Sequence, residues 1–237
     1  MHNRGKIFLI PTSIAEDTAE KVIPLQIREA LINIKHFLVE DVRTARRYLS
    51  SLKIYSSIEE LSFNVLNKDT KKDVLKTFFE PVTNGFNLGI ISESGCPGVA
   101  DPGALAVNYA HEQELQVIPL VGPSSILLSL MASGLNGQHF AFHGYLPVDG
   151  KEASKAIKDL EKESKTKNQT QIFIETPYRN KSVMQNLVSS LNENTLLCRA
   201  IDVTGAHENI KTKPVKSWRK VKDELPKLPA IFLFLAN

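Results

Sequence analysis

The stretch "ISESGCPGVADPG" (residues 91–103) decides the fold, because it joins a strand pattern to a helix pattern through a glycine-rich turn. The apolar run "LGIIS" (88–92) leads into it, and a helical pattern follows it. Asp101 is a good N-cap residue, and Pro102 at the first helical position loses no hydrogen bond that a helix needs. This order predicts a loop at the carboxyl edge of a sheet, where open α/β folds bind ligands.

The composition of this loop predicts how it meets a ligand. Gly95 and Gly98 lack side chains, so a ligand can approach the main chain, while Pro97 and Pro102 restrict the conformations of the loop. A loop that recognises its ligand through backbone groups suits a nucleoside or an amino-acid group better than a bulky apolar one.

Short apolar runs alternate with helical patterns along the chain, which is typical of a parallel sheet covered by helices. We expect two α/β halves, with the second half repeating the architecture of the first. The predicted strands are 6–10, 36–42, 88–92, 115–121, 139–146, 171–176, 195–203 and 230–236, and the predicted helices include 21–34, 70–84, 125–133 and 150–165.

A second glycine–proline turn follows the next predicted strand, in "VGPSSILLSLMASGL" (121–135). Ser124 or Ser125 can cap the apolar helix that begins there, and Gly134 is a plausible residue to end it. If the two strands are neighbours, free N–H groups and two hydroxyls lie beside the first loop. Two such turns after successive strands favour a ligand crevice over a purely structural role.

Composition and spacing exclude several classes of protein. Gly98 and Gly103 have P-loop spacing, but no lysine follows them, and a dinucleotide fingerprint is absent. Cys96 and Cys198 lie far apart, which argues against a disulfide scaffold or a zinc site and fits a reducing cytoplasm. No apolar run approaches the roughly 20 residues of a membrane span.

Positive charge concentrates in one segment of a chain whose net charge is +3. Residues 211–227 carry seven basic and two acidic side chains. The segment can hold a phosphate backbone, or it can be a solvated surface. Trp218 within it can stack on a base or pack over the second sheet.

Seven segments, taken in order, resemble the tetrapyrrole methylase superfamily of S-adenosylmethionine-dependent methyltransferases. Within it they are most similar to the branch that 2′-O-methylates a cytidine ribose in 16S ribosomal RNA. The segments are "IPTSI" (10–14), "EDVR" (40–43), "SESGCPGVADPG" (92–103), "VIPLVGPSSILLSLMASGL" (117–135), "HFAFHGYLP" (139–147), "IFIETPYR" (172–179) and "DVTGAHE" (202–208).

The resemblance implies two α/β/α domains, each with a mostly parallel or mixed sheet, and a cofactor cleft between them. Domain 1–122 would hold the glycine-rich cofactor loop, and domain 123–237 would close over S-adenosylmethionine, usually in a homodimer. The cofactor-binding positions implied are Pro11, Ser94, Gly95, Cys96, Val99, Ser124, Ser125, Glu175, Val203, Pro229 and Ala230.

Departures from the family pattern concern the acceptor more than the cofactor. Ser13, Ala15 and Glu16 stand where the family has a proline and then Gly-Asn. The segment "NVLNKD" (64–69) lies near where the ribosomal branch has a histidine–aspartate–histidine cluster, which is missing here. Methylation is therefore better supported than any particular acceptor.

Methyl transfer to an oxygen needs a group that removes its proton. Glu40 and Asp41 end a predicted strand, and Arg43, Arg46 and Arg47 would share one helix face. We expect Asp41 or Glu40 to organise the acceptor and Arg43 to hold a phosphate. The alternative is an acidic helix start followed by ordinary solvated arginines.

The main prediction is a cytoplasmic methyltransferase that 2′-O-methylates a ribose in ribosomal RNA. Its expected partners are RNA and a second copy of the chain, and we expect no membrane association. Two alternatives are a methyltransferase for a small, tetrapyrrole-like acceptor and a non-catalytic S-adenosylmethionine-binding protein. His139 and His143 point one way on a predicted strand, but without a third ligand we expect no metal site.

Overall fold

The computed structural model describes residues 4–221 and 224–236. The chain forms two compact units, Met1–Ser124 and Ser125–Asn237, and each is described by itself. The first unit thus ends at Ser124, whereas the expected boundary follows residue 122. Within the described ranges, no helix combines the length and the apolar character that a membrane crossing requires.

The first unit is built around a five-stranded sheet in which every pairing is parallel. Its strands are β1 (Ile7–Ile10), β2 (Ile34–Val39), β3 (Ser62–Val65), β4 (Asn87–Ile91) and β5 (Val117–Pro119). The order across the sheet is β3-β2-β4-β1-β5. Because parallel strands end at the same edge, the loops that follow β1, β2, β4 and β5 gather there.

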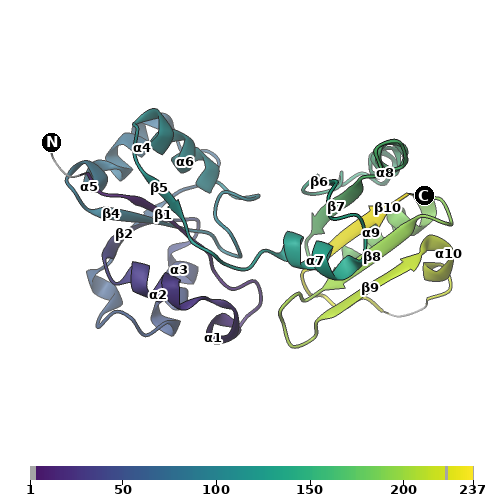
Figure 1. Ribbon diagram of the computed structural model, residues 1–237, viewed down its shortest axis with the longest axis horizontal. Helices are drawn as coiled ribbons and strands as arrows, with labels where there is room; N and C mark the ends of the chain where they lie inside the picture. Colours follow the sequence, from purple (N-terminus) through teal and green to yellow (C-terminus); the bar gives the residue numbers. More distant parts are fainter. Residues whose placement is uncertain (1–3, 222–223, 237) are drawn as a thin grey trace. The chain divides into compact units, whose positions relative to one another are not determined.

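Helices cover both faces of this sheet (Figure 1). One layer contains α1 (Ala19–Val22), α2 (Leu25–Leu31), α3 (Val42–Ser51) and the 3₁₀-helix η1 (Ile58–Glu60), and the other contains α4 (Lys72–Phe78), α5 (Glu80–Thr83) and α6 (Gly103–Glu112). Phe37 of β2 packs with Ile27 and Leu49 in one core, while Leu38 packs with Phe79 in the other. Adjacent residues of β2 thus bury themselves on opposite faces, which explains its continuous apolar run.

The second unit has a mixed sheet of order β6-β7-β10-β8-β9. Its strands are β6 (Phe140–Phe142), β7 (Thr170–Glu175), β8 (Leu196–Ile201), β9 (Asn209–Pro214) and β10 (Ala230–Leu235). β6 and β7 pair in parallel, and the other three pairings are antiparallel. The expectation that this half repeats the first is therefore wrong in strand direction. The broader prediction, two α/β units with parallel or mixed sheets, is confirmed.

Helices also lie on both faces of the second sheet. α8 (Gly150–Lys167), α9 (Asn180–Ser190) and α10 (Val215–Trp218) pack on one face, and α7 (Ser125–Ser133) packs on the other. Phe173, Phe232 and Phe234 form the centre of the first of these cores. α7 covers the predicted range, and Gly134 follows it with a left-handed φ of 69°.

Candidate functional site

The candidate site lies at the carboxyl edge of the first sheet, where β1 and β4 are neighbours. The chain leaves β1 toward the face covered by α1 and α2, and it leaves β4 toward α6 on the opposite face (Figure 1). The crossovers thus change direction between these two strands. A change of this kind opens a crevice at the strand ends, which is the usual ligand site of an open α/β sheet.

The loop after β4 is shaped by its own backbone requirements. Gly95 and Gly98 have φ of 76° and 82°, a left-handed conformation that side chains disfavour. The Asp101 carboxylate accepts hydrogen bonds from the N–H groups of Gly98 and Gly103, both at 2.7 Å. α6 begins at Gly103, so the prediction that Asp101 is the N-cap and Pro102 the first helical residue is wrong by one position. The role of these glycines beside a ligand stays a prediction.

Three loops meet over the end of β1. The arrangement expected if β4 and β5 were neighbours does not occur, because β1 lies between them. The N–H of Thr12 nevertheless donates to the carbonyl of Gly95 (2.9 Å), and a Cβ on Gly95 would lie 3.3 Å from the carbonyl oxygen of Pro123. A Cβ on Gly122 would lie 2.1 Å from Cβ of Pro11, well inside contact distance. The backbones of these loops are therefore packed directly on one another.

The other expected cofactor residues of this unit surround that contact. Cys96 Sγ lies 3.4 Å from the carbonyl oxygen of Pro123, and burial raises the pKa of the Cys96 thiol. Ser94 is exposed, and Val99 keeps 49% of its surface exposed. Ser124 is half-buried at the end of the second turn. The structure thus brings these residues to one edge, with Ser94 and Val99 accessible to solvent.

Acidic side chains gather at the ends of β2 and β4. Glu40 accepts a hydrogen bond from the N–H of Glu93 (3.4 Å). Burial raises the pKa of Glu40, that N–H lowers it, and the negative charges of Asp101 and Glu93 raise it further. Burial likewise raises the pKa of Asp101, against the lowering effect of the N–H groups of Gly98 and Gly103. A carboxylate with a raised pKa is suited to accept a proton near neutral pH.

The charged residues at the start of α3, which the sequence groups into one candidate site, make different contacts in the structure. Asp41 is its N-cap and accepts a hydrogen bond from the N–H of Thr44 (2.7 Å), which lowers the pKa of this carboxylate. Arg43 is exposed, Arg46 forms an ion pair with a glutamate of η1, and Arg47 lines a cavity. Arg43 therefore remains accessible, and its expected contact with a phosphate stays a prediction.

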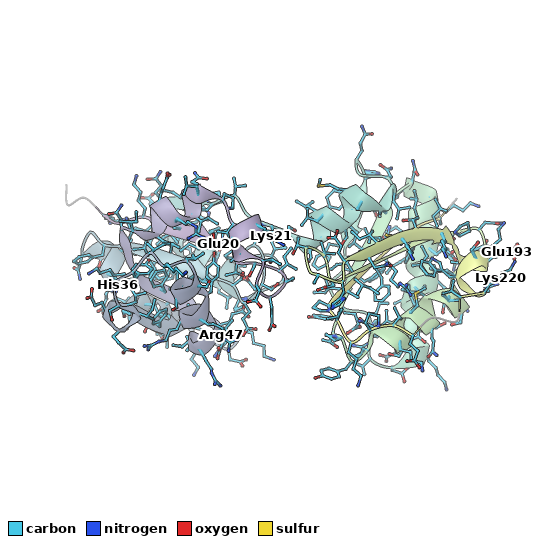
Figure 2. The ribbon with its side chains drawn as sticks, turned by 90° about the horizontal axis from the view of Figure 1, so that it is seen from below. Glu20, Lys21, His36, Arg47, Glu193 and Lys220 are labelled. Atoms are coloured by element: carbon cyan, nitrogen blue, oxygen red, sulfur yellow. The ribbon has the colours of Figure 1, made fainter. Side chains whose placement is uncertain are left out.

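A cavity of 490 Å³ opens between the loop after β1, α3 and the end of β4. Figure 2 shows Glu20 and Arg47, two of its lining residues, on α1 and α3. Its wall includes the positions that depart from the family pattern, Ser13, Ala15 and Glu16. The carboxylate-bearing residues Glu16, Asp17, Glu20 and Glu93 line it together with one guanidinium, that of Arg47.

Sequence reasoning misses Tyr48, which also lines this cavity. Its hydroxyl donates to the carbonyl oxygen of Pro11 (2.9 Å), and burial raises the pKa of this hydroxyl. The bond holds α3 against the end of β1. The helical period of α3 indicates that Tyr48 faces inward, but it gives no sign that the side chain reaches the crevice.

The expected residues of the second unit gather at one edge of its sheet. Ala230 begins β10 and pairs with Glu175 at the end of β7 and with Ile201 at the end of β8. Pro229 accepts a hydrogen bond at its carbonyl oxygen from the N–H of Asp202 (2.9 Å) and is exposed. Val203, 4% exposed, is buried beside this bond, and Ser125 begins α7.

Buried polar atoms at this edge lack hydrogen-bond partners. Glu175 Oε1 accepts from the N–H of Thr176 (2.8 Å), whereas Oε2 has no hydrogen bond among the described residues and lies 3.5 Å from an Arg179 nitrogen. Thr204 Oγ1 is also buried without a partner in the described part of the chain, and its φ is 71°. Unsatisfied atoms and a strained β-branched residue are features that a ligand site can explain.

Known proteins resemble this chain over most of its length, although no family model matches it. "Ribosomal RNA small subunit methyltransferase I" of Vibrio cholerae is 28% identical over 88% of this chain and 68% of its own. The protein of the same name in Escherichia coli O157:H7 is 26% identical over 90% of this chain and 71% of its own. The chain thus spans about two thirds of the length of these relatives.

Solved structures share the fold. The methyltransferase CobJ aligns with a TM-score of 0.63 at 16% identity, covering 98% of this chain and 94% of its own. Uroporphyrin-III-C-methyltransferase from Thermus thermophilus gives a TM-score of 0.57 at 15% identity, covering 98% and 92%. This chain shares the fold of these two methyltransferases. The resemblance predicted from the motifs is confirmed, and the sequence homologues carry the name of the predicted ribosomal branch.

Proposed function

We propose that this chain is an S-adenosylmethionine-dependent methyltransferase that 2′-O-methylates a ribose of small-subunit ribosomal RNA. The observation that carries the proposal is the similarity to the ribosomal RNA methyltransferase I proteins, which extends over 88% and 90% of the chain. A cytoplasmic location and a homodimer belong to the same proposal. Light scattering of the purified chain tests the homodimer.

The carboxyl edge of the first sheet fits a nucleoside-bearing cofactor. The Gly95 and Gly122 loops pack closely on neighbouring loops at the strand ends, the edge at which open α/β sheets bind ligands. In the second unit, Glu175 and Thr204 carry buried oxygens that lack hydrogen bonds within the described chain. We assign the cofactor to Pro11, Ser94, Gly95, Cys96, Val99, Ser124, Ser125, Glu175, Val203, Pro229 and Ala230. When bound, S-adenosylmethionine supplies an electrophilic methyl group on a positively charged sulfur.

In this proposal the chain positions the acceptor ribose and takes up its proton. The 2′-oxygen would bond to the methyl carbon as the bond from that carbon to sulfur breaks and leaves a neutral thioether, and its O–H proton would pass to a carboxylate, for which we assign Glu40. The raised pKa of Glu40 suits it to accept the proton, and the hydrogen bond from the Glu93 N–H positions its carboxylate. Asp41 is engaged as a helix cap, so its part is to position α3, and Arg43 would contact an RNA phosphate from the exposed start of that helix.

The activity test uses labelled S-adenosylmethionine with undermethylated 30S subunits, free ribosomal RNA and total transfer RNA in parallel. We expect label in 30S ribosomal RNA, recovered after digestion as a 2′-O-methylnucleoside. Label in transfer RNA or in no RNA contradicts the acceptor. Cofactor binding without transfer to any RNA favours the non-catalytic alternative, and transfer to a tetrapyrrole favours the small-acceptor alternative.

A pair of adjacent variants tests the assignment of the proton acceptor. Glu40→Gln keeps the shape of the side chain but removes the base, so we expect turnover to fall by about a hundredfold or more. Asp41→Ser retains an oxygen that can cap α3, and we expect it to leave turnover nearly unchanged. Calorimetry of cofactor binding controls for a disturbed site. Equal losses in the two variants would reject the separation of roles.

A further inference from the structure

The second unit contains a larger cavity that the proposed reaction does not use. Its volume is 900 Å³, and it lies between α9, β8, α10 and the residues that follow α10. This is the helix-covered face that packs α8 and α9, opposite the face covered by α7. The described residues that line it include Lys181, Gln185, Arg199, Trp218 and Arg219.

Arg199 stands at a position where the strand pattern calls for an apolar side chain. Leu197 and Ile201, two residues away on either side, belong to the α8–α9 core and are 0% and 1% exposed. Because side chains alternate across a strand, Arg199 points to the same face, and it is only 5% exposed. A buried cation on a core face departs from the apolar pattern of the strand, and a local departure of this kind is expected at functional sites.

Trp218 holds this cation at the cavity wall. The guanidinium carbon of Arg199 lies 4.8 Å from the centre of the indole ring, and Nζ of Lys213 lies 5.1 Å from it. The indole N–H donates to the carbonyl oxygen of Leu197 (2.8 Å). Trp218 is 3% exposed, so it packs over the sheet and does not offer its face to a base. Of the two alternatives from the sequence, packing is confirmed.

Further positive charge surrounds the cavity. Lys181 and Arg219 line it from exposed positions, and Glu224 is the one acidic residue in its described lining. Lys220 continues the series on the surface, at the same end of the unit as Glu193 (Figure 2). Four apolar side chains also line the described wall: Met184, Val188, Val221 and Leu225. Cations beside an apolar wall suit a ligand with a phosphate and a flat, weakly polar base.

We propose that this cavity binds a single-stranded nucleotide segment of the RNA substrate, with its phosphate beside Lys181, Arg199 and Arg219. The inference rests on the proposed function for the identity of that RNA. It gives Lys181, Arg199 and Arg219 a role in holding substrate, apart from the residues assigned to cofactor and proton transfer. The volume is within the range of small-ligand sites and accommodates a nucleotide.

The test uses Trp218, the only tryptophan of the chain, as a fluorescent reporter. The intact protein is titrated with a single-stranded RNA of small-subunit sequence, with adenosine monophosphate and with inorganic phosphate. We expect RNA to change the emission and Lys181→Glu to weaken RNA binding by roughly tenfold, with a shallower salt dependence. Lys158→Glu is the matched control, because Lys158 is exposed on α8 and outside the cavity lining.

The outcomes separate this inference from the proposed function. Equal weakening in Lys181→Glu and Lys158→Glu would overturn it, because the effect would then be general charge attraction. A response to phosphate but not to RNA would also overturn it. RNA binding that depends on Lys181 in a protein that methylates no ribosomal RNA would uphold the cavity and reject the function. If Lys181→Glu methylates ribosomal RNA with unchanged kcat/KM and unchanged RNA affinity, the proposed function is upheld and the role of the cavity is rejected.

Discussion

The two units build their candidate sites in different ways. In the first, all strands run parallel, so successive loops converge at one edge and touch through backbone atoms, as at Gly122 and Pro11. In the second, three of the four strand pairings are antiparallel, and the edge near Glu175 combines the ends of β7 and β8 with the start of β10. Buried side-chain oxygens of Glu175 and Thr204 without hydrogen bonds among the described residues mark that edge. The first edge is thus distinguished by contacts between backbones, and the second by buried polar side chains.

The cavities of the two units also differ in charge. Four carboxylate-bearing residues and one arginine line the cavity of the first unit, which suits a cationic ligand or proton transfer. Three cationic residues and one acid line the described wall of the second unit's cavity, which suits phosphate. The two cavities therefore suit ligands of opposite charge.

The largest expected effect comes from adding a single methyl group to the first unit. Gly122→Ala places Cβ against Pro11 and forces the loops after β1 and β5 apart. We expect the free energy of unfolding to fall by about 3 kcal/mol and cofactor binding to be lost. Urea unfolding and calorimetry with S-adenosylmethionine measure the two effects.

Gly137→Ala is the matched control for that change. A Cβ on Gly137 meets no heavy atom within 4 Å, so the same substitution adds no overlap. We expect it to alter stability by less than about 0.5 kcal/mol. If Gly122→Ala is equally mild, the loops do not pack as closely as the backbone contact requires.

A smaller effect is expected from removing a whole side chain at the edge of the second unit. Glu175→Ala leaves Arg179 without its partner carboxylate and removes the acceptor of the Thr176 N–H. We expect a loss of about 2 kcal/mol in urea unfolding, together with weaker cofactor binding by calorimetry. Glu193→Ala, at an exposed position of the same unit, should change neither. A Glu175 variant that binds cofactor normally would remove this residue from the site.

The elements that the sequence predicts best are the buried ones. β1 and β10 are apolar throughout, β4 has no polar residue after Asn87, and all three lie in sheet interiors, so local pattern and tertiary packing agree. The predictions miss β3 and β9, because both are edge strands with polar side chains, "SFNV" and "NIKTKP". Such strands gain their structure from pairing with a neighbour, which no local pattern reveals.

The candidate site likewise has one part that the sequence predicts and another that it does not. The glycine–proline turns are visible in the sequence, because their residue types are tied to backbone conformation. The cavity lined by Tyr48 and Arg47 is not, since it depends on how α3 packs against the end of β1. Arg199 is similar: only the register of β8, with Leu197 and Ile201 buried on either side, shows that its position faces a core.

The smallest expected effect is a change in how the stability of the first unit depends on pH, and it tests the burial of the Asp101 carboxylate. Burial raises the pKa of Asp101 above 3.8, so the folded chain binds this proton more readily than the unfolded chain. Stability from this group therefore falls as pH rises from about 3.8 through the raised value. Asp101→Asn removes that titration but keeps an oxygen for the N–H groups of Gly98 and Gly103. The free energy of unfolding of the variant, measured across this pH range, should rise relative to that of the wild type as pH rises.

Asp41→Asn provides a control of opposite sign in the same unit. The Thr44 N–H lowers the pKa of Asp41 below 3.8, so the stability from this group is present above the ordinary pKa and is lost as pH falls through the lowered value. The free energy of unfolding of this variant should therefore fall relative to that of the wild type as pH rises. Parallel pH profiles for the two variants would mean that burial of the loop carboxylate does not set its protonation, and the acidic edge beside Glu40 would lose its basis as a proton acceptor.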